Sequence, residues 1–313
     1  MNNSSYINAL KNNTLLKGFN RKCKFTSIIE AKKIIPLKNA QSNKGDYGKL
    51  LCIAGSREMT GAAVLSASAA VKSGAGLVTV AAPKSIISVI QSHLLESVFM
   101  PLTENYLGSI SLTSIDTLIQ NTYNSTACMV GCGLGDNVVT GSIIEELIDK
   151  TKLPLIIDAD ALNGIAKNKS ILSNSRGNMI LTPHPGEMAR LCGTSVSKVQ
   201  SSRINFARNF AKIHNVIMVL KGAYTIIADP TGEVNINPTG NPGMAKGGSG
   251  DVLTGIISSF VAQGMGLREA AVAGVFIHGM SADIAAKENS VYAMTPSDIV
   301  DSLGKAFLKI IKV

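Results

Sequence analysis

The sequence has no tryptophan, and aromatic residues make up only 4% of its 313 residues. Single-stranded nucleic acid is held largely by stacking on aromatic side chains, so we expect no nucleic-acid partner. The chain also lacks a run of 18 apolar residues, which predicts that it has no membrane span. Its first 40 residues do not contain the apolar core of a secretory signal. These absences together favour a cytoplasmic protein.

Clusters of metal ligands are also missing from the sequence. Five cysteines and four histidines are scattered along the chain, whereas zinc sites need such residues at short, regular spacings. Most of the cysteines lie in apolar runs typical of strands, where a reduced and buried thiol is the usual state. We therefore expect no metal bound directly by protein ligands.

The formal net charge of +9 is concentrated in the first part of the chain. Residues 1–50 contain ten Lys or Arg against Glu30 and Asp46, which leaves a net charge near +1 for the remainder. A basic segment rich in Asn and Ser is typical of a solvated tail. We interpret residues 1–40 as a basic leader, poorly ordered or partly helical, and residues 41–313 as one large domain.

From residue 48 onward, short β-branched runs alternate with segments of helical length. The runs at 49–54, 77–81, 127–131, 154–158, 179–182, 216–220 and 224–228 are predicted to be buried strands. Helices are predicted at 61–73, 138–150, 185–192, 196–214, 250–263, 267–287 and 296–312. This alternation is typical of an α/β fold with a mainly parallel sheet between helical layers, in which ligands bind at the carboxyl ends of the strands.

A glycine-rich segment gives the strongest functional signal. Gly247, Gly248, Ser249 and Gly250 lead into Asp251 and a long apolar helix. Glycines let backbone N–H groups point the same way, and a helix N-terminus adds unpaired donors and a positive dipole end. The segment therefore predicts an anion hole for phosphate, with Asp251 as the base for an attacking hydroxyl. The alternative is a flexible helix cap. No Walker A motif is present.

Further polar or glycine-rich motifs follow other predicted strands. They are Gly61-Ala62-Ala63, Gly131-Cys132-Gly133-Leu-Gly135, Asp158-Ala-Asp160-Ala-Leu-Asn163, Thr182-Pro-His184-Pro-Gly-Glu187 and Lys221-Gly222-Ala223-Tyr224-Thr225. A histidine between two prolines either presents its ring to a ligand or is structural. Lys221 either reaches phosphate or is an ordinary hairpin lysine. One acid of the third motif could cap a helix, and the others could contact a ligand or metal-bound water.

Eight motifs in this order resemble the ADP-dependent NAD(P)H-hydrate dehydratase family: Lys44-Gly-Asp-Tyr-Gly48, Ala54-Gly-Ser56, Gly61-Ala-Ala63, Ser73-Gly-Ala-Gly76, Asp158–Asn163, Thr182–Glu187, Lys221–Thr225 and Gly247–Gly255. The resemblance implies a ribokinase-like three-layer α/β/α fold, with residues 41–313 as the catalytic domain. It also implies a repair reaction that uses ADP to dehydrate (6S)-NAD(P)H hydrate. The ring hydroxyl would be phosphorylated, and elimination of phosphate would return NADH or NADPH.

The resemblance also assigns roles to individual residues. Asp251 would be the base, and it would bind the hydrate together with Ala62, Gly133, Asn163 and His184. The nucleotide would be bound by Lys221, Gly222, Ala223, Tyr224, Thr225 and Gly250. The anion hole would comprise Gly247, Gly248, Ser249 and Gly250. Mg²⁺ would accompany ADP without a direct protein ligand.

Two departures from the family pattern are Asn43, where His is frequent, and Cys132, where Pro is frequent. Many relatives also carry an epimerase domain, for which the first 40 residues are too short. We therefore expect a stand-alone dehydratase that acts on NADHX and NADPHX, releases AMP and works beside a separate NAD(P)HX epimerase. We also expect a homo-oligomer, such as a tetramer. The alternatives are a hydroxymethylpyrimidine or hydroxyethylthiazole kinase of the same fold and a non-catalytic nucleotide sensor.

Overall fold

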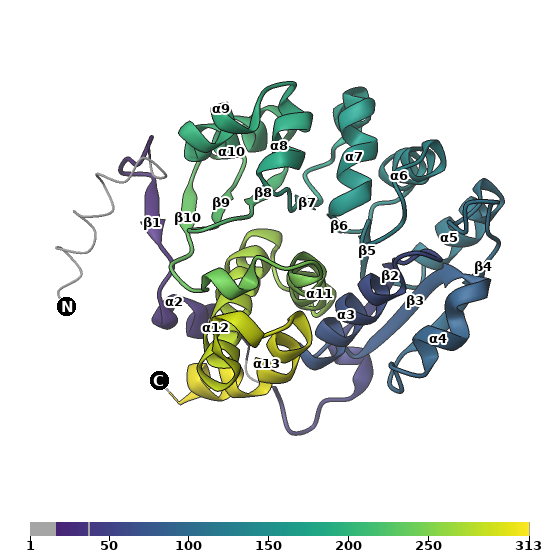
Figure 1. Cartoon of the computed structure of the whole chain (residues 1–313), viewed down its shortest axis with the longest axis horizontal. Coiled ribbons are helices and arrows are strands. Elements are labelled where there is room, and N and C mark those ends of the chain that lie inside the picture. The colour runs from purple at the N-terminus through teal and green to yellow at the C-terminus, as the bar shows by residue number, and fades with distance from the viewer. Residues whose placement is uncertain (1–16, 37, 313) are drawn as a thin grey trace.

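The computed structural model of the chain describes residues 17–36 and 38–312. Within them, ten strands form one sheet in the order β1-β10-β9-β8-β7-β6-β5-β2-β3-β4 (Figure 1). The strands are β1 (Cys23–Phe25), β2 (Lys49–Ile53), β3 (Leu77–Pro83), β4 (Val98–Leu102), β5 (Ala127–Val130), β6 (Leu155–Ile157), β7 (Met179–Leu181), β8 (Ile217–Leu220), β9 (Ile226–Ala228) and β10 (Val234–Ile236). Only β9 runs antiparallel to its neighbours, so the prediction of a mainly parallel sheet is confirmed.

Helices cover both faces of the sheet, as Figure 1 shows. One layer contains α2 (Ile28–Ile34), α3 (Thr60–Lys72), α4 (Ile87–Gln91), α11 (Ser249–Ala262), α12 (Leu267–Ala293) and α13 (Pro296–Ile311). The other contains α5 (Ile115–Thr122), α6 (Val138–Lys150), α7 (Ala159–Lys167), α8 (Pro185–Cys192), α9 (Val196–Ser201) and α10 (Arg203–His214). None of these described helices combines the length and hydropathy that a membrane crossing requires.

Alternating side chains of each central strand pack into opposite layers. In β2, Leu50 and Cys52 join the core under α3 and α11, whereas Leu51 and Ile53 join the core under α5 to α10. Because successive side chains of a strand point to opposite faces, a strand buried on both faces must be apolar throughout. This is why the strands are recognisable as continuous apolar runs, and the three-layer α/β/α arrangement follows from it.

The direction of chain progression through the sheet reverses between β2 and β5. From β2 the chain moves outward through β3 to β4, and it then returns to place β5 on the other side of β2. The loops after these two strands are joined by a hydrogen bond from the Gly55 N–H to the Cys132 carbonyl (2.8 Å). Such a reversal opens a crevice at the carboxyl ends of the strands, which is where open α/β sheets bind ligands.

Several elements differ from the sequence prediction, and each has a physical reason. The edge strands β1 and β4 were not predicted: β1 has only three residues, and β4 contains Pro101, which only an edge strand tolerates. The helix predicted at 196–214 is divided into α9 and α10 at Ser202, whose ψ of 45° leaves the helical region. The helix predicted at 267–287 continues to Ala293 across a kink at Ser290.

The expected leader contributes to the fold in its second half. Residues 1–16 lie outside the described residues. Strand β1 pairs in parallel with β10, and α2 packs Ala31 into the same core as α12 and α13. The sheet therefore begins before the expected domain boundary at residue 41.

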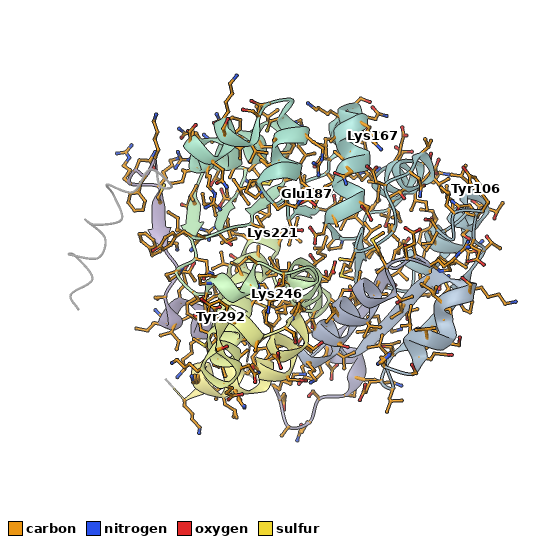
Figure 2. All side chains as sticks on the ribbon, viewed as in Figure 1. Tyr106, Lys167, Glu187, Lys221, Lys246 and Tyr292 are labelled. Atoms are coloured by element: carbon orange, nitrogen blue, oxygen red, sulfur yellow. The ribbon has the colours of Figure 1, made fainter. Side chains whose placement is uncertain are left out.

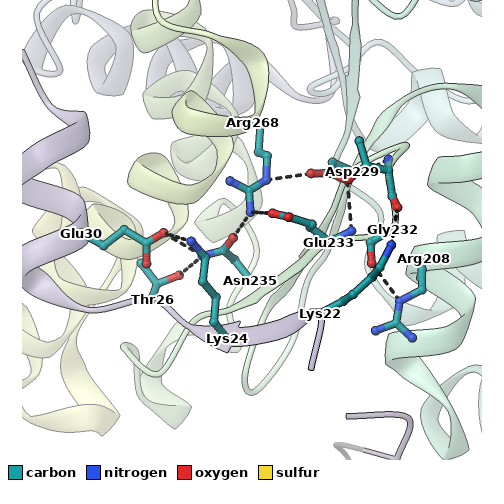
Figure 3. A network of polar contacts seen from close by, with 11 residues as sticks. Lys22, Lys24, Thr26, Glu30, Arg208, Asp229, Gly232, Glu233, Asn235 and Arg268 are labelled. Atoms are coloured by element: carbon teal, nitrogen blue, oxygen red, sulfur yellow. Dashed lines mark hydrogen bonds and ion pairs between the residues drawn. The ribbon is translucent and has the colours of Figure 1, made fainter. Parts of the chain in front are cut away.

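A polar network joins this early segment to the remote β10 and α12 (Figure 3). Arg268 of α12 forms an ion pair with Asp229 (2.8 Å) and donates to the Asn235 side chain (2.7 Å). Asn235 in turn donates to Thr26 and Glu30. Because Asn235 is only 1% exposed, these partners satisfy a side-chain amide that burial would otherwise leave unpaired.

The Lys44–Gly48 motif is structural, and Gly48 explains why. Its φ of +72° lies in the region that favours glycine, and a Cβ at this position would lie 1.7 Å from the Ala262 carbonyl oxygen at the end of α11. The Gly76 N–H also donates to the Tyr47 carbonyl at 2.9 Å. The motif therefore fixes the ends of α3 and α11 against the start of β2.

We expect Gly48→Ala to lower the free energy of unfolding by about 3 kcal/mol or more, because it combines a strained φ with a backbone clash. Gly304 provides a matched control, since it lies in α13 and a Cβ added there would meet nothing within 4 Å. Gly304→Ala should stabilise the protein by about 0.5–1 kcal/mol. Urea unfolding measures both changes, and equal effects of the two substitutions would contradict the packing role of Gly48.

Candidate active site

The site lies where the loops after five parallel strands meet the beginning of α11. Gly133, in the turn after β5, has a φ of +67°, and a Cβ there would lie 2.7 Å from the Cβ of Ala62 in α3. The Gly135 N–H donates to the Asp160 carboxylate at 2.8 Å. The glycine turn is therefore in contact with α3 on one side and with α7 on the other. Gly133 and Ala62 lie against each other at the crevice.

The glycine-rich segment forms the N-terminus of α11. Gly248 occupies the N-cap position with a φ of +98°, and no side chain caps the helix. A Cβ on Gly250 would lie 3.2 Å from Lys221 Nζ, so the first turn closely approaches the loop after β8. The Ser249 hydroxyl is buried without a hydrogen-bond partner among the described residues. An uncapped helix start with a nearby ammonium is suited to an anion.

Asp251 lies in the first turn of α11 and has a strongly perturbed proton affinity. Burial, followed by the negative charge of Asp158, raises the pKa of its carboxyl to about 7. The Cys132 thiol hydrogen-bonds to it and lowers the pKa in part. Burial keeps the pKa of Cys132 well above its usual range, so the thiol remains a protonated donor. Asp251 is therefore able to exchange a proton near neutral pH.

Lys221 and Asp158 form a buried ion pair beside Asp251. Lys221 Nζ lies 2.6 Å from Asp158 Oδ1, and Asp158 Oδ2 accepts from the Thr254 hydroxyl at 2.7 Å. Glu187 lies 3.9 Å from the same ammonium (Figure 2). Burial lowers the pKa of Lys221, but the charges of Asp158 and Glu187 outweigh it and raise the pKa above its ordinary value. Lys221 is thus a fixed cation at the entrance of the α11 N-terminus.

His184 and Asn163 contribute to the framework around this ion pair. His184 is the N-cap of α8: its Nδ1 accepts from the Gly186 and Glu187 N–H groups. The neutral ring therefore carries its proton on Nε2. Burial, together with Lys221 and Arg190, lowers the pKa of His184, which keeps the ring neutral at physiological pH. Asn163 Oδ1 accepts from Arg190 Nε at 2.9 Å.

The loop between β8 and β9 carries five of the expected nucleotide-binding residues, Lys221 to Thr225. Gly222 and Tyr224 have φ values of +134° and +54°. The Thr225 hydroxyl donates to the Gly222 carbonyl at 3.0 Å, which closes the loop on itself. The side chain of Arg203 in α10 donates hydrogen bonds to three backbone carbonyls at this loop, those of Leu220, Lys221 and Ala223.

The structure brings most of the expected site residues to one end of the sheet. Sequence reasoning did not identify Arg203 and Thr254, and it gave Glu187 and Cys132 no chemical role. Asp158 and Thr254 are 96 residues apart, so no local pattern could have paired them.

One group of acidic and thiol side chains has the spacing of a metal site. Ligand atoms of Cys132, Asp158 and Asp251 lie within 4.8 Å of one another. The chemistry of the group argues against a resident Mg²⁺, because Mg²⁺ prefers oxygen ligands whereas Cys132 is a protonated thiol. Both oxygens of Asp158 are also engaged, by Lys221 and Thr254.

The three-layer α/β/α fold and the uncapped, glycine-rich start of α11 define a ribokinase-like α/β protein. Residues 50–305 match the family described as NAD(P)H-hydrate dehydratase. A crystal structure of the ADP/ATP-dependent NAD(P)H-hydrate dehydratase from Bacillus subtilis, co-crystallised with ATP and Mg²⁺, superposes with a TM-score of 0.80 at 28% identity and covers 93% of this chain and 100% of that one. The chain belongs to the NAD(P)H-hydrate dehydratase family.

Curated relatives of two lengths match the chain. The ADP-dependent (S)-NAD(P)H-hydrate dehydratase of Neisseria meningitidis is 38% identical over 272 residues, which cover 86% of this chain and 88% of the relative. The bifunctional NAD(P)H-hydrate repair enzyme of Moorella thermoacetica is 42% identical over 269 residues, which cover 86% of this chain but 51% of that protein. The chain therefore spans about half the length of the bifunctional relatives that it matches.

The raised pKa of Asp251 predicts a pH-dependent stability. Between its unfolded pKa near 4 and its folded pKa of about 7, the folded protein binds more protons, so stability falls as pH rises. Asp251→Asn removes this dependence. As pH rises from 4 to 8, we expect the free energy of unfolding of the wild type to fall by on the order of 3 kcal/mol relative to that of the variant.

Denaturant unfolding across this pH range measures the effect. Asp301→Asn is the control, because the Asp301 side chain is 70% exposed. A constant difference between Asp251→Asn and wild type at all pH values would show that Asp251 titrates normally.

Proposed function

We propose that this protein dehydrates (6S)-NAD(P)H hydrate to NAD(P)H, using ADP as the phosphate donor. The observation that carries the proposal is the position of Asp251. A carboxylate with a pKa of about 7 lies in the first turn of an uncapped helix, next to the fixed cation of Lys221. The N-terminus of a helix is a favourable site for phosphate, and a general base is most effective when its pKa lies near the working pH.

In this proposal, the first step is a phosphoryl transfer. Asp251 accepts the proton of the hydrate's ring hydroxyl as its oxygen forms a bond to the terminal phosphorus of ADP, and AMP leaves. The phosphorylated ring then loses phosphate and an adjacent ring proton, and the ring nitrogen's lone pair assists the departure. The balance is hydrate plus ADP giving NAD(P)H, AMP and phosphate, so the water formally removed appears in the phosphate.

The surrounding residues divide into two groups in the proposed reaction. Ala62, Gly133, Asn163 and His184 line the hydrate side, where small residues permit close approach of the nicotinamide ring. Lys221 to Thr225 and Gly250 bind the nucleotide, and the donors of Gly247 to Gly250 form the anion hole. Lys221 lies between the groups, where its charge stabilises the phosphate that is being transferred.

Mg²⁺ is proposed to enter with the nucleotide. Several acidic side chains, among them Asp158, Glu187 and Asp251, act on the ammonium of Lys221 or are acted on by it. An additional negative diphosphate therefore needs a counter-charge, which Mg²⁺ supplies when it is bound to the phosphate oxygens. Its remaining positions would hold water, in keeping with its preference for retained hydration.

A vitamin-precursor kinase would use the same fold and the same base. The motifs that distinguish the two functions lie on the hydrate side, around Ala62, Gly133 and His184, and the family membership of the chain favours the dehydratase. A mere nucleotide sensor would gain nothing from a buried carboxylate facing phosphate.

The direct test supplies hydrated NADH or NADPH with Mg²⁺ and either ADP, ATP or no nucleotide. We expect the near-ultraviolet absorbance of the reduced nicotinamide to return with ADP, and AMP to form in equal amount. Turnover with ATP but not with equal ADP would refute the choice of donor. Phosphorylation of a hydroxymethylpyrimidine or hydroxyethylthiazole, without any return of NADH, would instead support the kinase.

Asp251→Asn tests the proposed base. General-base removal costs about 10²–10⁴-fold in rate, so turnover should collapse. Affinity for ADP should stay within several-fold of wild type or increase slightly, because a negative charge facing phosphate is removed. Asp301→Asn again serves as the control. Near-normal turnover of Asp251→Asn would show that Asp251 is not the base and only occupies the first turn of the helix.

A further inference from the structure

Arg203 is a buried cation with an unusual set of partners. It is 1% exposed and lies at the start of α10, below the loop of residues 221–225. Among the described residues, no carboxylate lies within ion-pair distance of it. Burial alone lowers its pKa, to about 10, which leaves the guanidinium charged at neutral pH. Arg268, by contrast, is paired with Asp229 and Glu233 (Figure 3).

The partners of Arg203 are backbone carbonyls of the β8–β9 loop. Its Nη2 donates to the carbonyls of Leu220 (3.2 Å) and Lys221 (3.1 Å), and its Nη1 donates to that of Ala223. A planar guanidinium holds its donors in a rigid fork, whereas an ammonium cannot hold several carbonyls in one plane. Arg203 therefore fixes the orientation of three peptide groups over a stretch of four residues.

Fixing these carbonyls also fixes the direction of the N–H groups. In a trans peptide, the N–H points opposite to the C=O, and the described residues contain no cis peptide. The Lys221 carbonyl is directed to Arg203, so the N–H group of Gly222 is directed away from Arg203. A backbone N–H directed in this way, close to the uncapped start of α11, is suited to bind an anion.

The backbone angles of the loop require such a constraint. Tyr224 adopts a φ of +54°, which is uncommon for a residue with a side chain and persists only where the surroundings impose it. Gly222 has a φ of +134°, and a Cβ there would lie 2.9 Å from Arg203 Nη2. Glycine thus lets the guanidinium approach the backbone, and the guanidinium in turn holds the loop in its unusual shape.

We propose that Arg203 is a positioning residue for the nucleotide, which orients the peptide groups of the β8–β9 loop so that the Gly222 N–H faces the bound diphosphate. The proposal deepens the proposed function and rests on it, since the ligand of this loop is taken to be ADP. Arg203 itself does not touch the ligand.

The test compares the dissociation constant for ADP with Mg²⁺, measured by calorimetry, with turnover at saturating ADP. Arg203→Lys keeps the charge but removes the fork, and Arg203→Gln keeps an amide donor without the charge. A hydrogen bond to a charged group contributes enough free energy to change an equilibrium constant by about tenfold or more, so we expect the dissociation constant to rise by about tenfold or more in both variants. Turnover at saturating ADP should fall by a smaller factor.

Arg208→Lys is the matched control. Arg208 lies on the same helix and also donates to a turn carbonyl, that of Gly232, but at the β9–β10 turn. We expect its ADP affinity to remain at the wild-type value. Thermal unfolding of each variant shows whether a change in affinity merely follows lost stability.

The outcomes separate the two levels of inference. Unchanged ADP affinity in a folded Arg203→Lys or Arg203→Gln variant would overturn the positioning role and leave the proposed function intact. If neither variant folds, Arg203 serves the fold and the positioning role is also overturned. Absence of ADP binding to the wild type itself would overturn the proposed function.

Discussion

The ion pair between Lys221 and Asp158 is the interaction on which the site depends. It joins the end of β8 to the end of β6, and through Thr254 it also reaches the second turn of α11. Breaking a buried pair by removing one partner leaves an uncompensated charge, which is far more costly than the pair itself. The relative positions of the strand ends and the helix are therefore fixed by charge as well as by packing.

The same pair sets the electrostatics of the crevice. The charge of Asp158 acts on Asp251 and contributes to its high proton affinity, while the charge of Lys221 acts in the opposite direction. Asp251 is thus balanced between protonated and ionised forms by its neighbours and by its limited exposure. The two carboxylates of the site therefore have different neighbours: Asp158 is tied to an ammonium, whereas Asp251 titrates near neutral pH.

The sequence predicted the seven central strands and the helix N-terminus at Asp251, because both have local signatures. Continuous apolar runs mark strands buried on two faces, and glycines before an apolar helix mark an open N-terminus. Arg203 had no such signature, since arginine in an amphipathic helix is usually exposed. Its burial follows from the loop that it supports, 18 residues further along the chain. The short strands β1 and β10 were not predicted, because Lys24 and Asn235 interrupt them and they are not continuous apolar runs.

The pairing of β1 with β10 also has a consequence for how the chain acquires its structure. Thr26 and Asn235 are in contact although 209 residues separate them. During synthesis, β1 and α2 leave the ribosome before the other described elements but must wait for β10 and α12 before their partners exist. The closing of this edge is thus a late, non-local event, of the kind that slows folding. Until then β10 presents an unpaired strand edge, to which another chain could add.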